Sequence, residues 1–306
     1  MNKRTYKIEG KIIEASHLEK MFYPGQKIRK QNILDYYHKI ASIMLPHLKG
    51  RPLNMHRAPD GIEGETFYQQ DAPDYFPRWI DLIEVTRADK TRLSHAICNS
   101  KAALIYLSNQ AVLSFHTWLS TAANIKKPDK MIFDLDPPPE GDFGLVIEGA
   151  LTIKDLFASM SIHCRVMTTG SKGLHVVIPI TPEYSFREVR EVARKIAEIL
   201  VNQVPGKFTM EPLKKNRQGK LYLDYARNSF GQTTICPYSL RILSTAPIAT
   251  PLDWEELKKP GIGPQSYNIG NIFRRLGQKQ DPWKNIYSHS GNLKTMKKWL
   301  KTYKKS

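Results

Sequence analysis

Residues 131–136 read Met-Ile-Phe-Asp-Leu-Asp, and they decide the fold more than any other stretch of the chain. Pro128 precedes this run and residues 137–139 are three prolines, so the pattern predicts a short buried strand that ends in a turn. Alternate side chains of a strand share a face, so Asp134 and Asp136 project together. Two adjacent carboxylates are unfavourable unless a cation lies between them, and hard oxygen ligands favour Mg²⁺ or Mn²⁺. The alternative is an exposed strand that carries two solvated acids.

Helices and strands are mixed on both sides of this strand, without an internal repeat. Helical spacing of apolar residues predicts helices over residues 31–45, 100–112, 143–160 and 185–204. Pro46 is expected to end the first helix, and Ser185 and Glu188 form a capping box at the start of the last. Extended segments are predicted at residues 113–118, 164–168, 174–180 and 221–226, a basic loop at 20–30 and a surface connector at 247–281. This mixture indicates an α+β or α/β domain of the enzyme type.

The whole chain is strongly basic. Its 306 residues include 46 Lys and Arg against 29 Asp and Glu, a formal net charge of +17. Such an excess predicts a polyanionic partner such as nucleic acid, bound through counterion release. The 41% of hydrophobic residues are enough to build a core, which excludes a disordered basic tail.

Several other classes of protein are disfavoured. No stretch approaches the roughly 18 consecutive apolar residues of a membrane span, and the N-terminus lacks the apolar region of a signal peptide. We therefore expect a cytoplasmic, nucleoid-associated protein without a membrane partner. The cysteines Cys98, Cys164 and Cys236 are far apart and form no CxxC or CxxH pair, which argues against a disulfide framework and a zinc finger.

The C-terminal segment, residues 282–306, carries much of the excess charge. No acidic residue follows Asp281, and seven lysines contribute +7, namely Lys284, Lys294, Lys297, Lys298, Lys301, Lys304 and Lys305. Apolar residues recur there at steps of three or four, at Leu293, Met296, Leu300 and Tyr303, which predicts a basic amphipathic helix. This helix either packs by its apolar stripe and leaves a solvated outer face, or contacts nucleic acid.

A glycine loop at residues 168–175, Thr-Thr-Gly-Ser-Lys-Gly-Leu-His, forms a second candidate site. Two glycines around Ser171 and Lys172 let backbone N–H groups approach an anion such as a triphosphate. The order of a Walker loop is missing, and the following sequence is β-rich. An ordinary hairpin turn is the alternative, as is a core role for His175 on the next strand.

Asp224, at the end of a further predicted strand, could complete three carboxylates around two metal ions, although it could also be a cap or a salt-bridge partner.

Four blocks of sequence, in this order, resemble the polymerase domain of bacterial DNA ligase D. They are residues 133–137, Phe-Asp-Leu-Asp-Pro; residues 170–175, Gly-Ser-Lys-Gly-Leu-His; residues 224–228, Asp-Tyr-Ala-Arg-Asn; and residues 233–241, Thr-Thr-Ile-Cys-Pro-Tyr-Ser-Leu-Arg. That domain belongs to the archaeo-eukaryotic primase superfamily and serves non-homologous end joining. The resemblance extends from about Leu18 to Tyr267, without a fused ligase or nuclease module, as in a stand-alone form.

The resemblance implies an α+β, primase-type catalytic core. Such a core has a central antiparallel sheet related to the RNA-recognition fold and an N-terminal α/β module. We expect a catalytic domain over residues 1–281, formed by two intertwined modules of about 1–125 and 126–281, followed by the basic C-terminal helix.

The resemblance also implies roles for individual residues. Asp134, Asp136 and Asp224 match carboxylates that bind two metal ions, often Mn²⁺ in preference to Mg²⁺. The residues that match the nucleotide pocket are Ser171, Lys172, Gly173 and His175 for the triphosphate, Arg241 in the same pocket, His116 near the sugar and Arg57 near the active centre. Lys20 and Lys30 match lysines that bind the 5′-phosphate at a gap, and Phe67 and Tyr68 match an aromatic pair that stacks on template bases.

Some positions depart from the pattern of the family. Tyr68 stands where many relatives have a second Phe, which keeps the stacking face. Gln70 and Gln232 fall where some relatives carry lysine. Alternatively, Phe67 and Tyr68 could be core residues, and Lys20 and Lys30 ordinary surface charges.

These residues predict a primase-like polymerase that adds NTPs or dNTPs to primer 3′-ends at gaps and broken DNA ends. Ku and a separate DNA ligase are the protein partners that the resemblance implies. A non-catalytic nucleic-acid-binding repair scaffold is the first alternative. The second is a phosphatase of the haloacid dehalogenase type, whose DxD also ends a strand. That class expects a Rossmann-like order near the N-terminus, whereas this DxD lies at mid-chain before three prolines.

Overall fold

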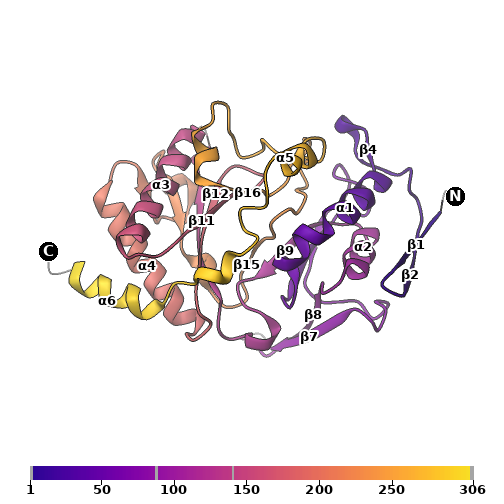
Figure 1. Cartoon of the computed structure of the whole chain (residues 1–306), viewed down its shortest axis with the longest axis horizontal. Helices are drawn as coiled ribbons and strands as arrows, with labels where there is room; N and C mark the ends of the chain where they lie inside the picture. Colours follow the sequence, from indigo (N-terminus) through magenta and orange to yellow (C-terminus); the bar gives the residue numbers. More distant parts are fainter. Residues whose placement is uncertain (1–2, 87–88, 140, 304–306) are drawn as a thin grey trace. The chain divides into compact units, whose positions relative to one another are not determined.

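The computed structural model describes residues 3–86, 89–139 and 141–303, and they form two compact units (Figure 1). The first unit is built from the described residues of Met1–Ala123, Thr233–Ala249 and Tyr267–Lys279. The second is built from those of Asn124–Gln232, Thr250–Ser266 and Gln280–Ser306. Each unit therefore combines segments that are far apart in the sequence.

A six-stranded sheet forms the centre of the second unit. Its order is β13 (Phe208–Thr209), β14 (Leu221–Asp224), β10 (Lys130–Asp136), β12 (Leu174–Pro179), β11 (Arg165–Thr168) and β16 (Pro251–Leu252). All neighbours run antiparallel except the parallel pair β13 and β14. The predicted buried strand at residues 131–136 is thus confirmed as β10, near the middle of the sheet.

Helix α3 (Phe143–Ser159) covers one face of this sheet. The Phe133 ring of β10 lies 6.0 Å from that of Phe157 on α3. A Cβ on Gly149 would lie 2.4 Å from a Leu221 methyl group and 3.8 Å from one of Leu135, so the missing side chain lets α3 approach closely. Asp134 alternates with Phe133 and Leu135 and therefore belongs to the opposite face of the sheet.

Helix α4 (Phe186–Gln203) begins as the sequence predicts. The Ser185 hydroxyl accepts a hydrogen bond from the Glu188 N–H (3.3 Å), and the Glu188 carboxylate accepts one from the Ser185 N–H (3.0 Å). The predicted basic C-terminal helix is confirmed as α6 (Leu293–Tyr303), although Lys304 and Lys305 lie outside the described residues.

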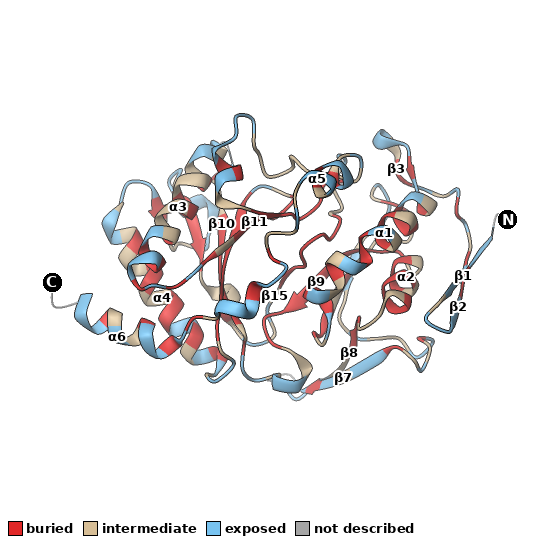
Figure 2. Cartoon of the chain, viewed as in Figure 1, coloured by how far each residue is buried: buried red, intermediate tan, exposed pale blue. Residues whose placement is uncertain are grey.

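The described residues of the first unit form a four-stranded sheet and three α-helices, among other elements. The sheet order is β15 (Thr233–Ile235), β9 (Val112–Trp118), β5 (Leu53–Arg57) and β6 (Phe67–Gln69). The helices are α1 (Lys30–Leu48), α2 (Lys101–Asn109) and α5 (Ile272–Gln278). Hairpins are formed by β1 (Arg4–Ile8) with β2 (Lys11–Ala15), β3 (Met21–Tyr23) with β4 (Ile28–Arg29), and β7 (Asp81–Thr86) with β8 (Arg92–Ile97). All seven residues of β9 are buried, α1 buries one face, and α2 is buried over most of its surface (Figure 2).

Three local predictions are wrong. Pro46 does not end the first helix, because α1 continues to Leu48 and the Lys49 N–H closes its last turn on the Leu45 carbonyl. Residues 20–30 are not a loop but contain β3, β4 and the first residue of α1. Residues 247–281 are not a surface connector, because they contain β16 and α5 and bury Ile248, Ala249 and Ile272.

The expected α+β class is confirmed by the mixed, mainly antiparallel architecture of both units. None of the described helices is both long and apolar enough to cross a membrane.

Candidate active site

Three neighbouring strands of the second unit place two of the predicted carboxylates and the predicted histidine in one row. Asp134 on β10 is the direct partner of Asp224 on β14, and on its other side it is the partner of His175 on β12. Residues opposite each other on adjacent strands share a face. Asp136 lies two residues further along β10, opposite Tyr222. The sequence could not show that these strands adjoin.

Arg227 joins two of these carboxylates. Its Nε lies 3.2 Å from Oδ2 of Asp134 and 3.1 Å from Oδ2 of Asp224. The other Asp224 oxygen, Oδ1, accepts hydrogen bonds from the N–H groups of Ala226 (2.9 Å) and Arg227 (3.3 Å). On the far side of Asp134, Nε2 of His175 lies 3.3 Å from Oδ1. The Asp-Tyr-Ala-Arg-Asn block contains Arg227, but nothing in the sequence indicated that its side chain reaches β10.

The three carboxyl groups differ in their electrostatic surroundings. Burial tends to raise the pKa of Asp134, but His175 and Arg227 outweigh it and hold that pKa below its ordinary value. Burial and then the nearby charge of Asp134 raise the pKa of Asp136 to about 6. Burial also raises the pKa of Asp224, against the opposing effect of Arg227. The site thus holds more negative charge than its neighbours fully compensate.

Such a donor set suits a hard divalent cation. Carboxylate oxygens are the ligands that Mg²⁺ and Mn²⁺ prefer, and two of the three carboxylates already converge on one positive charge, that of Arg227. In the part of the chain that the structure describes, no three His, Cys, Asp or Glu side chains stand as a ready-made metal cluster. An ion bound by Asp134 and Asp224 would therefore coordinate carboxylate oxygens that Arg227 contacts in this structure.

The glycine loop lies directly beside this end of β10. The Thr169 hydroxyl organises it, because Oγ1 accepts the N–H groups of Ser171 and Gly173 (both 3.3 Å) and donates to the Gly173 carbonyl (3.1 Å). Gly170 has a φ of +67°, a left-handed conformation that favours glycine. A Cβ on Gly173 would lie only 1.9 Å from the carbonyl oxygen of Leu135, so only glycine fits against this part of the β10 backbone.

The loop presents its polar groups outward. Ser171 is half-buried and Lys172 is exposed. The side chain of Gln265, which sequence reasoning missed, donates from Nε2 to the Ser171 carbonyl at 3.1 Å. The loop is the turn of the antiparallel β11–β12 hairpin, because Thr168 pairs with Leu174, so the hairpin alternative is confirmed for its backbone. Thr169, Gln265 and the close approach to β10 hold this turn in place.

In the first unit, the four-stranded sheet gathers other predicted residues. The Tyr68 ring of β6 stacks on His56 of β5, with ring centres 4.1 Å apart, and meets the His116 ring of β9 edge-on at 5.4 Å. His56 is a residue that the sequence analysis did not single out. Burial, and then the positive charge of Arg241, lower its pKa to about 4, so the ring is neutral at physiological pH.

Arg57 and Phe67 form a second contact on this sheet. The Arg57 guanidinium lies 5.6 Å from the centre of the Phe67 ring. It also donates to the Gln69 side chain (2.6 Å), the Tyr75 hydroxyl (3.0 Å) and the Gln110 carbonyl (2.9 Å). Phe67 and Tyr68 are 40% and 53% exposed, so the alternative that they are core residues is wrong.

Lys20 and Lys30 lie together at the start of α1. The Lys30 N–H donates to the Lys20 carbonyl at 2.9 Å, and the Lys20 ammonium pairs with Asp60 at 2.5 Å. Lys30 is 9% exposed, so it is not an ordinary surface charge. Burial, and then the charge of Lys20, lower the pKa of Lys30 to about 8. Both lysines also lie beside a helix N-terminus, which favours anions.

The chain is similar in sequence to proteins of one known family. Residues 29–283 match the family described as the LigD primase-polymerase domain. The chain is 32% identical over 276 residues to the bifunctional non-homologous end joining protein LigD of Bacillus subtilis, and 30% identical over 271 residues to the multifunctional LigD of Mycolicibacterium smegmatis. These alignments cover 90% and 88% of the chain but only 44% and 35% of the relatives, so the chain spans less than half the length of either.

A solved structure matches the fold over almost its whole length. It is the polymerase domain of Mycobacterium tuberculosis ligase D in complex with DNA, with a TM-score of 0.85 and 26% identity over 91% of this chain and 99% of that one. The expected primase-type fold is therefore confirmed. The chain belongs to the LigD primase-polymerase domain family.

Proposed function

We propose that this chain is a DNA repair polymerase of the primase type, which adds NTPs or dNTPs to primer 3′-ends at gaps and broken ends during non-homologous end joining. The observation that carries the proposal is the row formed by Asp224, Asp134 and His175 beside the glycine loop. A two-metal nucleotidyl transfer needs carboxylates next to a site for the triphosphate. The row and the loop are neighbours in one unit.

Asp134, Asp136 and Asp224 would hold two Mn²⁺ or Mg²⁺ ions. When bound, the ions would lower the pKa of the primer 3′-hydroxyl and neutralise charge that develops on the phosphates. The chain's own task is to hold the three carboxylates in place, which the strand pairing and Arg227 already do.

The incoming nucleotide would be held mainly by the glycine loop. Ser171, Lys172, Gly173 and His175 would bind the triphosphate. Nδ1 of His175 is buried and makes no hydrogen bond within the described residues, and a bound substrate would satisfy it. The resemblance implies that Arg241, His116 and Arg57, which belong to the first unit, also take part in binding the nucleotide.

DNA would be held by residues of the first unit. Lys20 and Lys30 would bind the 5′-phosphate at a gap, as the burial of Lys30 at the start of α1 and its backbone contact with Lys20 favour. Phe67 and Tyr68 would stack on template bases, a use to which exposed aromatic rings are suited. The matched polymerase domain of M. tuberculosis ligase D was solved in complex with DNA. Ku and a separate DNA ligase are the partners that we propose for the joining reaction.

Primer extension with labelled nucleotides and Mn²⁺ tests this function. Asp134→Asn should abolish extension and leave DNA binding intact, because the carboxylate is lost while the side-chain volume is kept. Asp155→Asn, an exposed position on α3, is the matched control and should extend primers like the wild type. Extension that persists in a pure preparation of Asp134→Asn would contradict the proposal.

The two alternative functions separate in the same experiment. A scaffold would bind DNA without extending it, and the buried, converging carboxylates are an unfavourable feature that a scaffold does not need. A phosphatase of the haloacid dehalogenase type requires a Rossmann-like sheet with parallel strands. Because β10 pairs antiparallel with both of its neighbours, that alternative is wrong.

A further inference from the structure

The C-terminal helix α6 presents two chemically distinct faces. Its apolar residues Leu293, Met296 and Leu300 are buried, and the helix packs on α4. The apolar stripe is therefore already occupied within the second unit and is not available for a membrane surface or a partner helix.

The exposed side of α6 carries a row of lysines. Lys294, Lys298 and Lys301 are exposed; we call these three residues the α6 lysine row. With 3.6 residues per turn they lie within about 60° of one another around the helix axis and span about 10 Å along it. Within the described residues none of the three makes an ion pair, and α6 carries no acidic residue.

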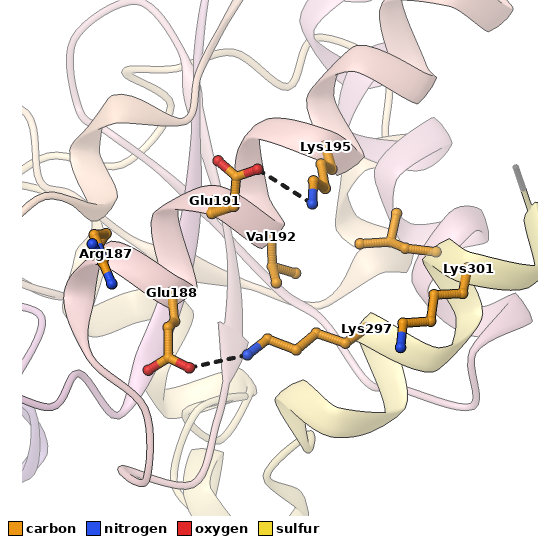
Figure 3. A pocket seen from close by; sticks show the side chains of 8 residues that line it. Arg187, Glu188, Glu191, Val192, Lys195, Lys297 and Lys301 are labelled. Carbon is orange, nitrogen blue, oxygen red and sulfur yellow. Dashed lines mark hydrogen bonds and ion pairs between the residues drawn. The ribbon is translucent and has the colours of Figure 1, made fainter.

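The groove between α4 and α6 adds to this positive surface (Figure 3). It encloses about 660 Å³ and is lined by Arg187, Glu188, Glu191, Val192, Lys195, Lys297, Leu300 and Lys301. Both of its acids are engaged internally, since Glu188 pairs with Lys297 at 3.1 Å and Glu191 with Lys195 at 3.3 Å. Arg187 and Lys301 make no ion pair with the described residues, so the groove keeps a net positive charge next to the lysine row.

We propose that the α6 lysine row binds the phosphodiester backbone of duplex nucleic acid as a second contact surface. The inference rests on the proposed function, because the duplex bound by the row would be the same DNA that occupies the active site. Helix α4 connects the two regions, since it packs against α6 at one point and at another against the short helix Ala226–Asn228, which carries Arg227. The row lies beyond residue 283, where the match to the family ends.

The chemistry of the row favours phosphates over an acidic protein. Lysine is depleted at protein interfaces, which use aromatic residues, Met and Arg as anchors, and the row offers none of these. Duplex DNA carries one negative charge per roughly 1.7 Å of its axis, so a row about 10 Å long faces several phosphates at once. Three unpaired lysines at this spacing match such a charge density.

A charge-removal experiment tests the proposal. The triple variant Lys294→Gln, Lys298→Gln, Lys301→Gln is compared with the control Lys126→Gln, Lys127→Gln, Lys259→Gln, which removes the same charge from other exposed positions of the second unit. Affinity for a fluorescent blunt duplex with 5′-hydroxyl ends is measured by anisotropy, without metal or nucleotide. This readout does not require polymerase chemistry, and wild-type primer extension reports the proposed function separately.

Each phosphate contact contributes about 0.9 to the slope of log affinity against log salt. Losing three contacts should therefore make that slope shallower by about 2.7. Between about 50 and 200 mM salt, the affinity of the α6 variant should then fall by a factor about 40 times smaller than the affinity of the wild type does. At the lower salt concentration the α6 variant should bind at least tenfold more weakly than the control. The triple Lys→Arg variant should bind like the wild type, and thermal melting should show that all variants are folded.

Three results would overturn the proposal. The first is a slope and affinity for the α6 variant equal to those of the control. The second is an equal loss on a single-stranded oligonucleotide of the same length, which would assign the row to unpaired DNA. The third is tighter binding of polyglutamate than of duplex, with the same dependence on the three lysines, which would indicate an acidic protein partner.

Discussion

Gly173→Ala is expected to disturb both stability and activity, because the residue has no room for a methyl group. The added Cβ would lie 1.9 Å from the Leu135 carbonyl oxygen, and real Cβ atoms essentially never come closer than 3.0 Å to another heavy atom. Gly173 would have to move about 1.1 Å away from β10, and therefore also relative to Thr169. Such a shift breaks the hydrogen bonds that tie Thr169 to Gly173, at about 1 kcal/mol each.

We therefore expect the free energy of unfolding of Gly173→Ala to fall by about 2 to 3 kcal/mol. A displacement near 1 Å at a positioned group also reduces turnover on the order of 100-fold. Urea denaturation gives the first quantity, and primer extension at saturating nucleotide gives the second. Gly206→Ala is the matched control, since a Cβ there meets nothing within 4 Å. It should leave stability unchanged or raise it by up to about 1 kcal/mol. If Gly173→Ala unfolded within about 0.5 kcal/mol of the Gly206 variant, the close approach would not exist and the reasoning would be refuted.

Three further predictions concern charge and stacking. Arg227→Gln should destabilise the protein by about 2 kcal/mol at pH 8, a value reduced because the guanidinium is 38% exposed. The loss should shrink as the pH falls through the pKa of Asp136, about 6, because Arg227 also compensates the charge of that carboxylate. Mn²⁺ should raise the melting temperature of the variant more than that of the wild type, and equal melting curves in chelator would contradict the prediction. Lys30, with a pKa of about 8, is charged below that pH. The preference for a 5′-phosphorylated gap should therefore decline between pH 7 and 9 in the wild type, but not in Lys30→Arg. If the preference depended on pH in the same way in both proteins, Lys30 would not bind the 5′-phosphate. Tyr68→Ala should weaken binding of a template overhang by about 1 to 3 kcal/mol, whereas Tyr68→Phe keeps the ring; anisotropy that does not distinguish the two variants would exclude stacking.

The sequence correctly predicted elements whose pattern lies within a few neighbouring residues. The strand at residues 131–136 carries its own apolar run and flanking prolines, and the capping box of Ser185 and Glu188 spans only one turn. Both were confirmed. Pro46 misled, because a proline blocks a helix only through the turn that precedes it. Pro46 lies two residues before the end of α1, and the helix continues through the N–H groups that follow it, such as that of Lys49, which donates to the Leu45 carbonyl.

The parts that were missed depend on contacts between distant segments. The side chain of Arg227 meets Asp134, 93 residues away, only because β14 pairs with β10. Gln265 reaches Ser171 across 94 residues. No periodicity or spacing in a single sequence encodes the order of strands in a sheet, so neither contact could have been inferred. The resemblance identified the correct family, but it suggested roles only for residues that match known motifs of that family.

Burial separates the positive charges of this chain into two classes with different responses to salt. Lys30 is buried and Arg227 is partly buried against the carboxylates of Asp134 and Asp224, so mobile ions screen their interactions less than those of exposed groups. The α6 lysine row is exposed, and its interactions should be screened within a Debye length of about 8 Å at physiological ionic strength. Raising salt should therefore weaken the association of the enzyme with DNA and leave the rate of extension in the bound complex nearly unchanged. Single-turnover extension at saturating enzyme measures the second quantity directly. A parallel decline of both would mean that exposed lysines, rather than the buried network around Asp134, position the reacting groups.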